Sequence, residues 1–227
     1  MHAAPRHPVP VFPLPELVLF PRATVPLHVF ELRYRTMVRD ALSRERLIAL
    51  ALLKPGYEAD YHGSPEFHTL GCLARFDEVE WLPDDRYNLR VVGIARARFE
   101  RIVCEFPYRS ARVALLPQAP YPEDDPLVRI EQRALLDLHR RMREMAEAAA
   151  GEEAARMFPD FGEEDPYERV VNAACMLCGA PAEERLALLA EDSVIERGRH
   201  VRTILEQRLR ARPTPRASGE SGGGEHN

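Results

Sequence analysis

The residue types that carry catalysis are sparse in this chain, and lysine is the scarcest of them. Lys54 is the only lysine and is followed by Pro55 and Gly56, so the phosphate-binding motif G-x-x-x-x-G-K-[ST] does not occur. A Ser-Lys peptidase dyad needs a lysine of lowered pKa beside its serine. Lys54 instead follows residues 47–53 (LIALALL), an apolar run of strand length. We therefore expect a solvated lysine at a strand end and no catalytic residue.

Three further motifs match chemical patterns, and each has a simpler structural interpretation. Residues 219–223 read G-E-S-G-G, a formal nucleophile elbow, but they lie in a Gly- and Ser-rich tail without the strand and helix that this motif requires. The C-x-x-C pair Cys175 and Cys178 falls near the end of a predicted helix, in an apolar stripe, which favours buried thiols over a redox or zinc pair. One loop carries metal-ligand residue types at a spacing that matches no zinc site: Asp60, His62, Glu66, His68 and Cys72. We expect no metal and no cofactor.

The composition is that of a soluble globular protein of one or two domains. The 227 residues are 45% apolar and 30% charged. No apolar run approaches the roughly 18 residues of a membrane span, and residues 1–12 have no apolar signal region. Together with four cysteines, this favours a cytoplasmic protein with reduced thiols and no membrane partner.

Charge is distributed unevenly but mildly. Residues 1–117 carry 16 Lys and Arg against 14 Asp and Glu, whereas residues 118–227 carry 15 against 22. Nucleic-acid binding draws most of its affinity from concentrated positive charge. Neither half has this concentration, so the charge argues against a nucleic-acid partner.

The first half of the chain predicts β-structure. Residues 9–14 and 25–30 are short apolar strands whose prolines favour sheet edges or bulges. Residues 47–53 suit a strand buried on both faces. The remaining predicted strands are 69–82, 88–92, 99–106 and 109–116, and residues 33–44 have the apolar spacing of a helix.

The second half predicts helices. An apolar stripe formed by Leu127, Ile130, Ala134, Leu135, Leu138, Met142 and Met145 indicates a long helix. Asp165 and Pro166 have the types of an N-cap and a first helical position, Gly179 suits the end of that helix, and Asp192 suits the cap of a last helix. The predicted division is a flexible N-terminus (1–8), a β domain (9–117), a Pro-rich linker (118–126), a helical subdomain (127–211) and a disordered tail (212–227).

Four segments carry a resemblance to a known family: residues 9–35 (VPVFPLPELVLFPRATVPLHVFELRYR), 71–75 (GCLAR), 92–99 (VGIARARF) and 108–117 (YRSARVALLP). They resemble the N-terminal, substrate-binding domain of Lon-type proteases, as a stand-alone domain without the ATPase and peptidase. The resemblance implies an α+β fold, with a small PUA-like β-barrel and one packed helix followed by a helical bundle. One residue departs from the family pattern, because Arg22 stands where the family reads Phe-Pro-Gly. A non-glycine residue there disfavours positive φ, which leaves the turn type open.

The resemblance implies a non-catalytic module that binds polypeptide, recruiting unfolded clients or a partner protein in proteolysis or quality control. The candidate partner-binding residues are Phe30, Arg33, Tyr34 and Trp81, since aromatic and Arg side chains are the usual anchors of recognition surfaces. We expect some of the first three to reach a groove between barrel and helix. In the structural alternative, Tyr34 lies in the core and Arg33 braces the helix. Trp81 either projects from a hairpin tip or closes the barrel.

Two other function classes remain open from the sequence. PUA-like barrels elsewhere hold RNA, and a continuous stripe of Arg75, Arg90, Arg96, Arg98 and Arg101 would favour that alternative. The mild charge of this half argues against it. An enzyme unrelated to Lon would need a clustered nucleophile and base, and no such cluster is evident. The oligomeric state is not predicted by the sequence.

Overall fold

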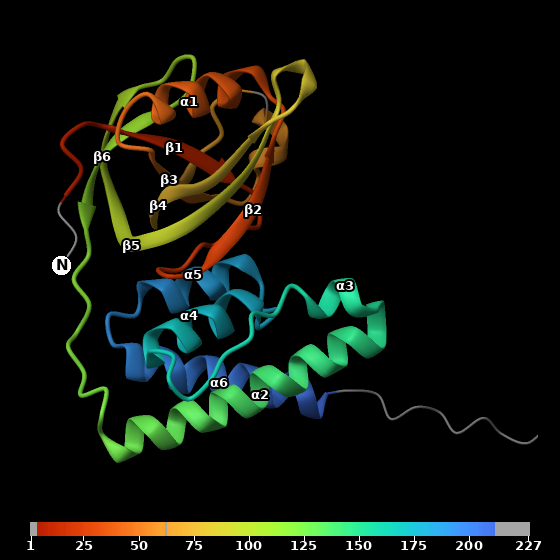
Figure 1. Cartoon of the computed structure of the whole chain (residues 1–227). Helices are drawn as coiled ribbons and strands as arrows, with labels where there is room; N and C mark the ends of the chain where they lie inside the picture. The colour runs from red at the N-terminus through yellow and green to blue at the C-terminus, as the bar shows by residue number, and fades with distance from the viewer. Residues whose placement is uncertain (1–3, 62, 212–227) are drawn as a thin grey trace, which may run out of the picture.

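The computed structural model describes residues 4–61 and 63–211, where a closed β-sheet precedes a group of helices (Figure 1). The sheet half contains β1 (Val9–Leu14), β2 (Thr24–Val29), α1 (Leu32–Leu42), β3 (Leu47–Leu53), η1 (Tyr57–Asp60), β4 (Phe67–Trp81), η2 (Pro83–Asp85), β5 (Tyr87–Cys104) and β6 (Ser110–Leu115). The helical half contains α2 (Pro126–Ala150), α3 (Glu152–Ala155), α4 (Tyr167–Leu177), α5 (Ala182–Ala190) and α6 (Val194–Arg210). The predicted disordered tail and its G-E-S-G-G motif lie outside the described residues.

The sheet closes on itself through β5 and β6. Strand β5 pairs with β2 through residues 87–92, with β4 along most of its length, and with β6 through residues 97–104. Strand β6 also pairs with the start of β1, and β1 runs parallel to β3. The order β2-β5-β4-β3-β1-β6 therefore returns to β5 and forms a barrel-like sheet, with α1 packed on β1 and β3. The predicted α+β class is confirmed.

Strand β5 is a single long strand, so the prediction of separate strands at residues 88–92 and 99–106 is wrong. In its pairing with β4, Ala74 faces Gly93 and Leu73 faces Ala95, which leaves Ile94 as an extra residue. Such a bulge bends a strand without ending it. A Cβ at Gly93 would lie 2.1 Å from the Phe20 carbonyl oxygen, so this bend requires glycine.

The two proline-containing strands differ in their place in the sheet. Strand β2 pairs only with β5 and lies at an edge, as predicted, but β1 lies between β3 and β6, so its prediction as an edge strand is wrong. The Val11 N–H bonds the Arg109 carbonyl at 2.8 Å on the β6 side. Because alternate residues of a strand face the same neighbour, the nitrogen of Pro13 also faces β6, beyond the last β1–β6 pair. The missing N–H of Pro13 therefore costs no ladder bond.

Strand β3 is buried on both faces, as its continuous apolar run predicted. Ala49 and Ala51 pack inside the closed sheet with other buried residues: Val9, Val11, Leu73, Ala97, Phe99 and Ala111. Ile48, Leu50 and Leu52 belong to a second cluster that continues into α1 and the helical half. Small residues on the inward face suit the narrow interior of a small closed sheet.

The starts of two helices in the helical half differ from prediction. Helix α4 begins at Tyr167, and the Asp165 carboxylate accepts from the Gly162 N–H at 3.0 Å instead of capping it. Ser193 caps α6 by accepting from the Glu196 N–H at 3.3 Å, so Asp192 is not the cap. The predicted end of α4 is confirmed, since Gly179 follows it with a φ of 68°.

The apolar stripe of α2 is also shifted. Leu127 and Ile130 are exposed, whereas the buried face consists of Val128, Gln132, Leu135, Leu138, His139 and Met142. Polar side chains join this face because they find carbonyl partners, Gln132 at Asp165 (2.6 Å) and His139 at Pro159 (2.8 Å). A count of apolar residues alone cannot find such positions. None of the helices in the described part of the chain is both long and apolar enough to cross a membrane.

Candidate functional site

The chemical motifs of the sequence do not assemble into a reactive centre. The Lys54 ammonium bonds the Glu66 carboxylate at 2.7 Å, and this bond lowers the pKa of Glu66. His68 contacts Glu183 at 2.8 Å, across to α5, and Cys72 is buried in the core. His62 lies outside the described residues. Within residues 4–61 and 63–211, no three His, Cys, Asp or Glu residues are placed to hold a metal ion.

The cysteines of the C-x-x-C motif are buried and free, in agreement with the structural interpretation of this motif. Burial raises the pKa of Cys175 and of Cys178 above the ordinary value of 9.0. Burial likewise raises the pKa of Cys72 to about 12. These thiols are protonated at neutral pH, and a protonated thiol is neither a nucleophile nor a metal ligand.

Two of the four candidate binding residues present aromatic rings to solvent. Phe30 is 60% exposed where β2 leads into α1, and its ring stacks 6.0 Å from that of His28. Trp81 is 72% exposed at the end of β4, next to η2. Trp81 therefore projects from the hairpin tip and does not close the barrel.

The other two candidates, Arg33 and Tyr34, lie in the first turn of α1 and line a pocket. Tyr34 is 7% exposed and packs its ring 4.5 Å from that of Phe12. The Arg33 guanidinium lies 4.7 Å from the centre of the Tyr34 ring. Tyr34 in the core and Arg33 beside it fit the structural alternative, and their role in binding a partner stays a prediction.

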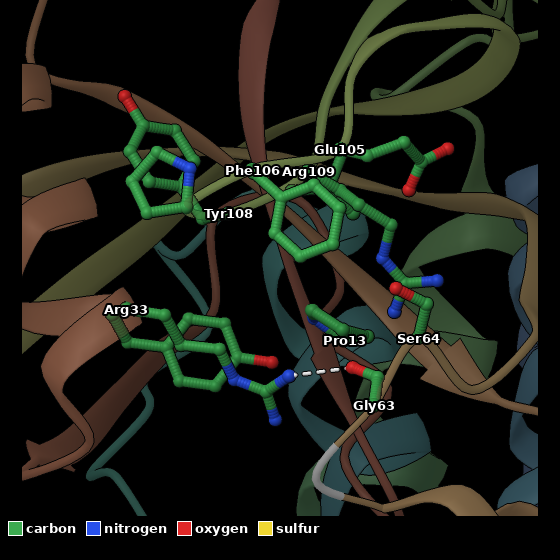
Figure 2. Close-up of a pocket in the computed structure, with 11 residues that line it drawn as sticks. Pro13, Arg33, Gly63, Ser64, Glu105, Phe106, Tyr108 and Arg109 are labelled. Carbon is green, nitrogen blue, oxygen red and sulfur yellow. Dashed lines mark hydrogen bonds between the residues drawn. The ribbon is translucent and has the colours of Figure 1, made fainter.

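The pocket has a volume of about 150 Å³ and lies between the start of α1, strand β1, the loop after η1 and the β5–β6 turn. Figure 2 shows Phe106 above Pro13, with Arg109 extending beside it toward Ser64 and Arg33 reaching toward Gly63 from the opposite side. The lining residues are Val11, Pro13, Arg33, Tyr34, Gly63, Ser64, Glu105, Phe106, Pro107, Tyr108 and Arg109. Phe106 is 80% exposed, the highest value among the large exposed apolar side chains of the described chain.

Each of the three guanidinium nitrogens of Arg33 has a partner, which occupies three of its five N–H donors. Its Nε bonds Glu31 at 3.0 Å, and its two terminal nitrogens bond the carbonyls of Gly63 (2.8 Å) and Tyr61 (3.1 Å). These bonds tie the first turn of α1 to the loop at residues 61–63. Arg33 therefore forms a fixed wall of the pocket.

Arg109 is held differently. One terminal nitrogen donates to the Pro65 carbonyl at 2.6 Å, and the guanidinium lies 4.6 Å from the centre of the Phe67 ring. Partial burial, with a smaller contribution from the charge of Arg33, lowers the pKa of Arg109 below its ordinary value of 12.5. No carboxylate of the described residues lies within 4.0 Å of its guanidinium nitrogens. Arg109 thus brings to the pocket a positive charge that forms no ion pair with the described carboxylates, although the charges of Glu105 and Asp60 act on it from further away.

The two tyrosines of the pocket are neutral at physiological pH. Burial raises the pKa of Tyr34, and the charge of Arg33 only partly opposes this. Burial also raises the pKa of Tyr108, whose hydroxyl donates to Asp40 at 2.7 Å. Neither phenol is poised to exchange protons near pH 7. The pocket offers aromatic surface, hydrogen-bonding groups and one positive charge, an arrangement suited to binding.

Sequence reasoning did not select Phe106 or Arg109. A signal was present, because Phe106 stands directly before Pro107, at the end of the predicted strand 99–106, where a turn to the next strand is expected. Exposed apolar residues at loop tips indicate contact surfaces. The proximity of this turn to α1 is not readable from the sequence, since closure of the sheet creates it.

The arginine stripe that would favour RNA binding is interrupted. Arg96 is 2% exposed and lies against the helical half, and Arg90 bonds Asp77 and Glu78. Arg75, Arg98 and Arg101 are exposed but are separated by these two positions. These five arginines therefore do not form the continuous basic stripe that would favour RNA binding.

The chain is thus an α+β protein, with a closed sheet, a small pocket beside α1 and an attached helical half. The family model of the ATP-dependent protease La (LON) substrate-binding domain matches residues 8–207. The chain therefore belongs to the Lon substrate-binding domain family.

Solved structures and full-length relatives show the same relationship. The chain superposes on a Lon N-terminal domain protein from Xanthomonas campestris with a TM-score of 0.57 and 24% identity, over 91% of this chain and 99% of that one. The N-terminal domain of a Mycobacterium avium complex Lon protease gives a TM-score of 0.58 and 16% identity, over 88% and 98%. Lon protease 2 of Myxococcus xanthus is 32% identical over 105 residues, which are 46% of this chain and 13% of that protein. The chain thus corresponds to a small part of the curated relatives.

Proposed function

We propose that this protein is a non-catalytic recognition module that binds polypeptide, either unfolded clients or a partner protein that it brings to proteolysis or quality control. Membership of a substrate-binding domain family supports the proposal. The relatives named as Lon proteases extend far beyond the matched region. We infer that their ATP-driven and proteolytic activities are not properties of this chain.

The observation that carries the proposal is the pocket beside α1, with the exposed Phe106 at its rim. A pocket with an exposed aromatic residue is suited to hold an apolar side chain of an unfolded polypeptide. Phe30 and Trp81 extend this surface in the proposal. Trp81 pairs with Tyr87 and Tyr87 pairs with Val29, so Phe30 and Trp81 are separated by about two strand spacings, or roughly 10 Å.

Fluorescence anisotropy with a labelled, reduced and carboxymethylated α-lactalbumin tests the proposal, since this polypeptide remains unfolded without denaturant. We expect saturable binding without nucleotide. Replacing Phe106 by Ser should weaken binding about tenfold, because loss of a central aromatic contact costs more than 1 kcal/mol. Phe30→Ser and Trp81→Ser should each weaken it about threefold or more.

Leu127→Ser is the matched control. Leu127 is 70% exposed, close to the exposure of Phe106, but lies on α2 in the helical half. Circular dichroism establishes that each variant is folded. The proposal is refuted if the wild-type protein shows no saturable binding at high micromolar concentration, or if Phe106→Ser and Leu127→Ser bind as the wild type does.

A further inference from the structure

We infer that the pocket beside α1 binds the C-terminal residue of a polypeptide, with an apolar side chain inside the pocket and the terminal carboxylate on Arg109. This inference rests on the proposed function and specifies the part of the polypeptide that is bound. Three features support it: the size of the pocket, the absence of an ion pair between Arg109 and the described carboxylates, and the distribution of the other charges.

The pocket has room for one side chain. Its volume is about 150 Å³, and an apolar cavity of about this size holds a benzene molecule. Phe106, Pro13 and Val11 supply apolar contact on its walls, and the Tyr34 ring lies among them. A phenyl or isobutyl group therefore fits, whereas two consecutive residues of a chain do not.

Arg109 supplies the anion-binding element. Its guanidinium uses one nitrogen for the Pro65 carbonyl and rests on the Phe67 ring, so the group is oriented before any ligand arrives. Its partial burial and the absence of a carboxylate partner among the described residues leave a charge that an incoming anion would neutralise. Arginine presents two parallel N–H donors to a carboxylate, which makes this recognition geometrically specific.

The remaining charged groups near the pocket are consistent with one bound carboxylate. Arg33 pairs with Glu31 and donates to two carbonyls, so its charge is balanced and three of its five N–H donors are used before a ligand arrives. Asp60 accepts from the Ser64 N–H at 3.1 Å. Glu105 is exposed and lines the pocket without an ion pair to Arg109, so it opposes an anion weakly from the solvent side.

A chain terminus satisfies both elements with a single residue. In a C-terminal residue, the carboxylate and the side chain are attached to the same Cα, which places them within the span of one small pocket. An Asp or Glu side chain followed by an apolar residue carries the same two groups on neighbouring residues. The pocket volume therefore favours the terminus.

The test compares fluorescein-labelled ten-residue peptides of one sequence that end in Phe with a free carboxylate or with a carboxamide. A third peptide carries an internal Asp-Phe pair and an amidated end. We expect the free acid to bind at least about tenfold more tightly than either amidated peptide, since a hydrogen-bonded charge pair is replaced by a neutral contact. Arg109→Gln should reduce this ratio to about one.

Glu105→Gln gives a second variant that leaves the Arg109 contacts in place. Removal of this neighbouring negative charge should strengthen binding of the free acid about two- to fivefold and leave the amide unchanged. Opposite changes at Arg109 and Glu105 cannot arise from general loss of folding.

The outcomes separate this inference from the proposed function. Equal, saturable binding of acid and amide overturns terminal recognition and leaves polypeptide binding intact. Equal binding of the internal Asp-Phe peptide and the free acid also overturns it, in favour of side-chain carboxylates. If unfolded α-lactalbumin binds and none of the peptides does, the pocket is not a terminus site. If nothing binds, the proposed function fails as well.

Discussion

The strongest single prediction concerns Arg96, which joins the sheet half to the helical half. This residue of β5 is 2% exposed. Its guanidinium donates to the Pro117 carbonyl, to the Asp192 carboxylate at 2.7 Å, and to three carbonyls at the end of α5, those of Leu189 (3.2 Å), Ala190 (3.2 Å) and Glu191 (3.1 Å). Carbonyls at a helix C-terminus have no partner in their own helix and carry partial negative charge. Arg96 therefore satisfies them from the other half of the molecule.

Replacing Arg96 by Met removes these bonds while filling most of the same volume. The Asp192 side chain is 68% exposed and becomes hydrated when the guanidinium is removed, so loss of this ion pair contributes little to the change in stability. The carbonyls of Leu189, Ala190 and Pro117 lose a charged donor, whereas that of Glu191 keeps the guanidinium of Arg197. Unpaired buried groups cost about 1–3 kcal/mol each, with incomplete additivity. We expect a loss of about 3–5 kcal/mol in the free energy of unfolding, a large part of the 5–15 kcal/mol that is typical for a folded protein.

Urea denaturation followed by far-ultraviolet circular dichroism measures this loss. With a slope of about 2–3 kcal/mol per molar urea, the midpoint should fall by about 1–2 M. Arg96→Lys should lose less, because an ammonium keeps the charge but cannot reach all the acceptors of a planar guanidinium.

Arg98→Met is the control, since Arg98 lies two residues further along β5 and is exposed. Its substitution should change the stability by less than about 0.5 kcal/mol. A loss below 1 kcal/mol for Arg96→Met would refute the reasoning, because it would show that the α5 carbonyls are satisfied without the guanidinium.

Three further predictions follow from local features. Arg22 has a φ of 63°, so Arg22→Gly should raise the melting temperature. Relief of about 1 kcal/mol of backbone strain should exceed the loss of the ion pair with Glu168, in which the Arg22 side chain is 54% exposed and the Glu168 side chain 13%. Burial lowers the pKa of His139 below 6.5. Near this pH the unfolded chain therefore binds more protons than the folded one, so the free energy of unfolding should fall as pH decreases through 6.5. In urea titrations, His139→Gln should flatten this pH dependence. Under native conditions a maleimide should label the exposed Cys104 quickly. The buried Cys72, Cys175 and Cys178 should be labelled only after the protein unfolds, as mass spectrometry would detect.

The sequence predicted those elements whose signal is local. The burial of residues 47–53 on both faces followed from an unbroken apolar run. The end of α4 followed from Gly179, because positive φ is inexpensive only for glycine. Arg22 shows the limit of such rules. The backbone retains the left-handed turn there although the residue disfavours it, since the Arg22 N–H bonds the Gly93 carbonyl at 2.8 Å.

The misassigned elements share one physical cause. Strand β5 was divided because a bulge at Ile94 interrupts the alternation without ending the strand. The buried face of α2 was displaced because Gln132 and His139 are buried through bonds to distant carbonyls. Both errors depend on contacts between residues distant in the sequence, because pairing with β4 carries β5 through the bulge and carbonyls outside α2 accept from Gln132 and His139.

For the site, the sequence by itself determined the residue types and left their arrangement open. With Lys54 as its single lysine, the sequence predicted neither a phosphate-binding motif nor a Ser-Lys dyad among these residues. Arg33 and Tyr34 were selected because aromatic and arginine side chains bind well. Only the tertiary structure placed the β5–β6 turn, with Phe106 and Arg109, beside the start of α1. The reason is closure of the sheet: β6 pairs with both β1 and β5, and this long-range pairing brings residues about 70 positions apart to one pocket.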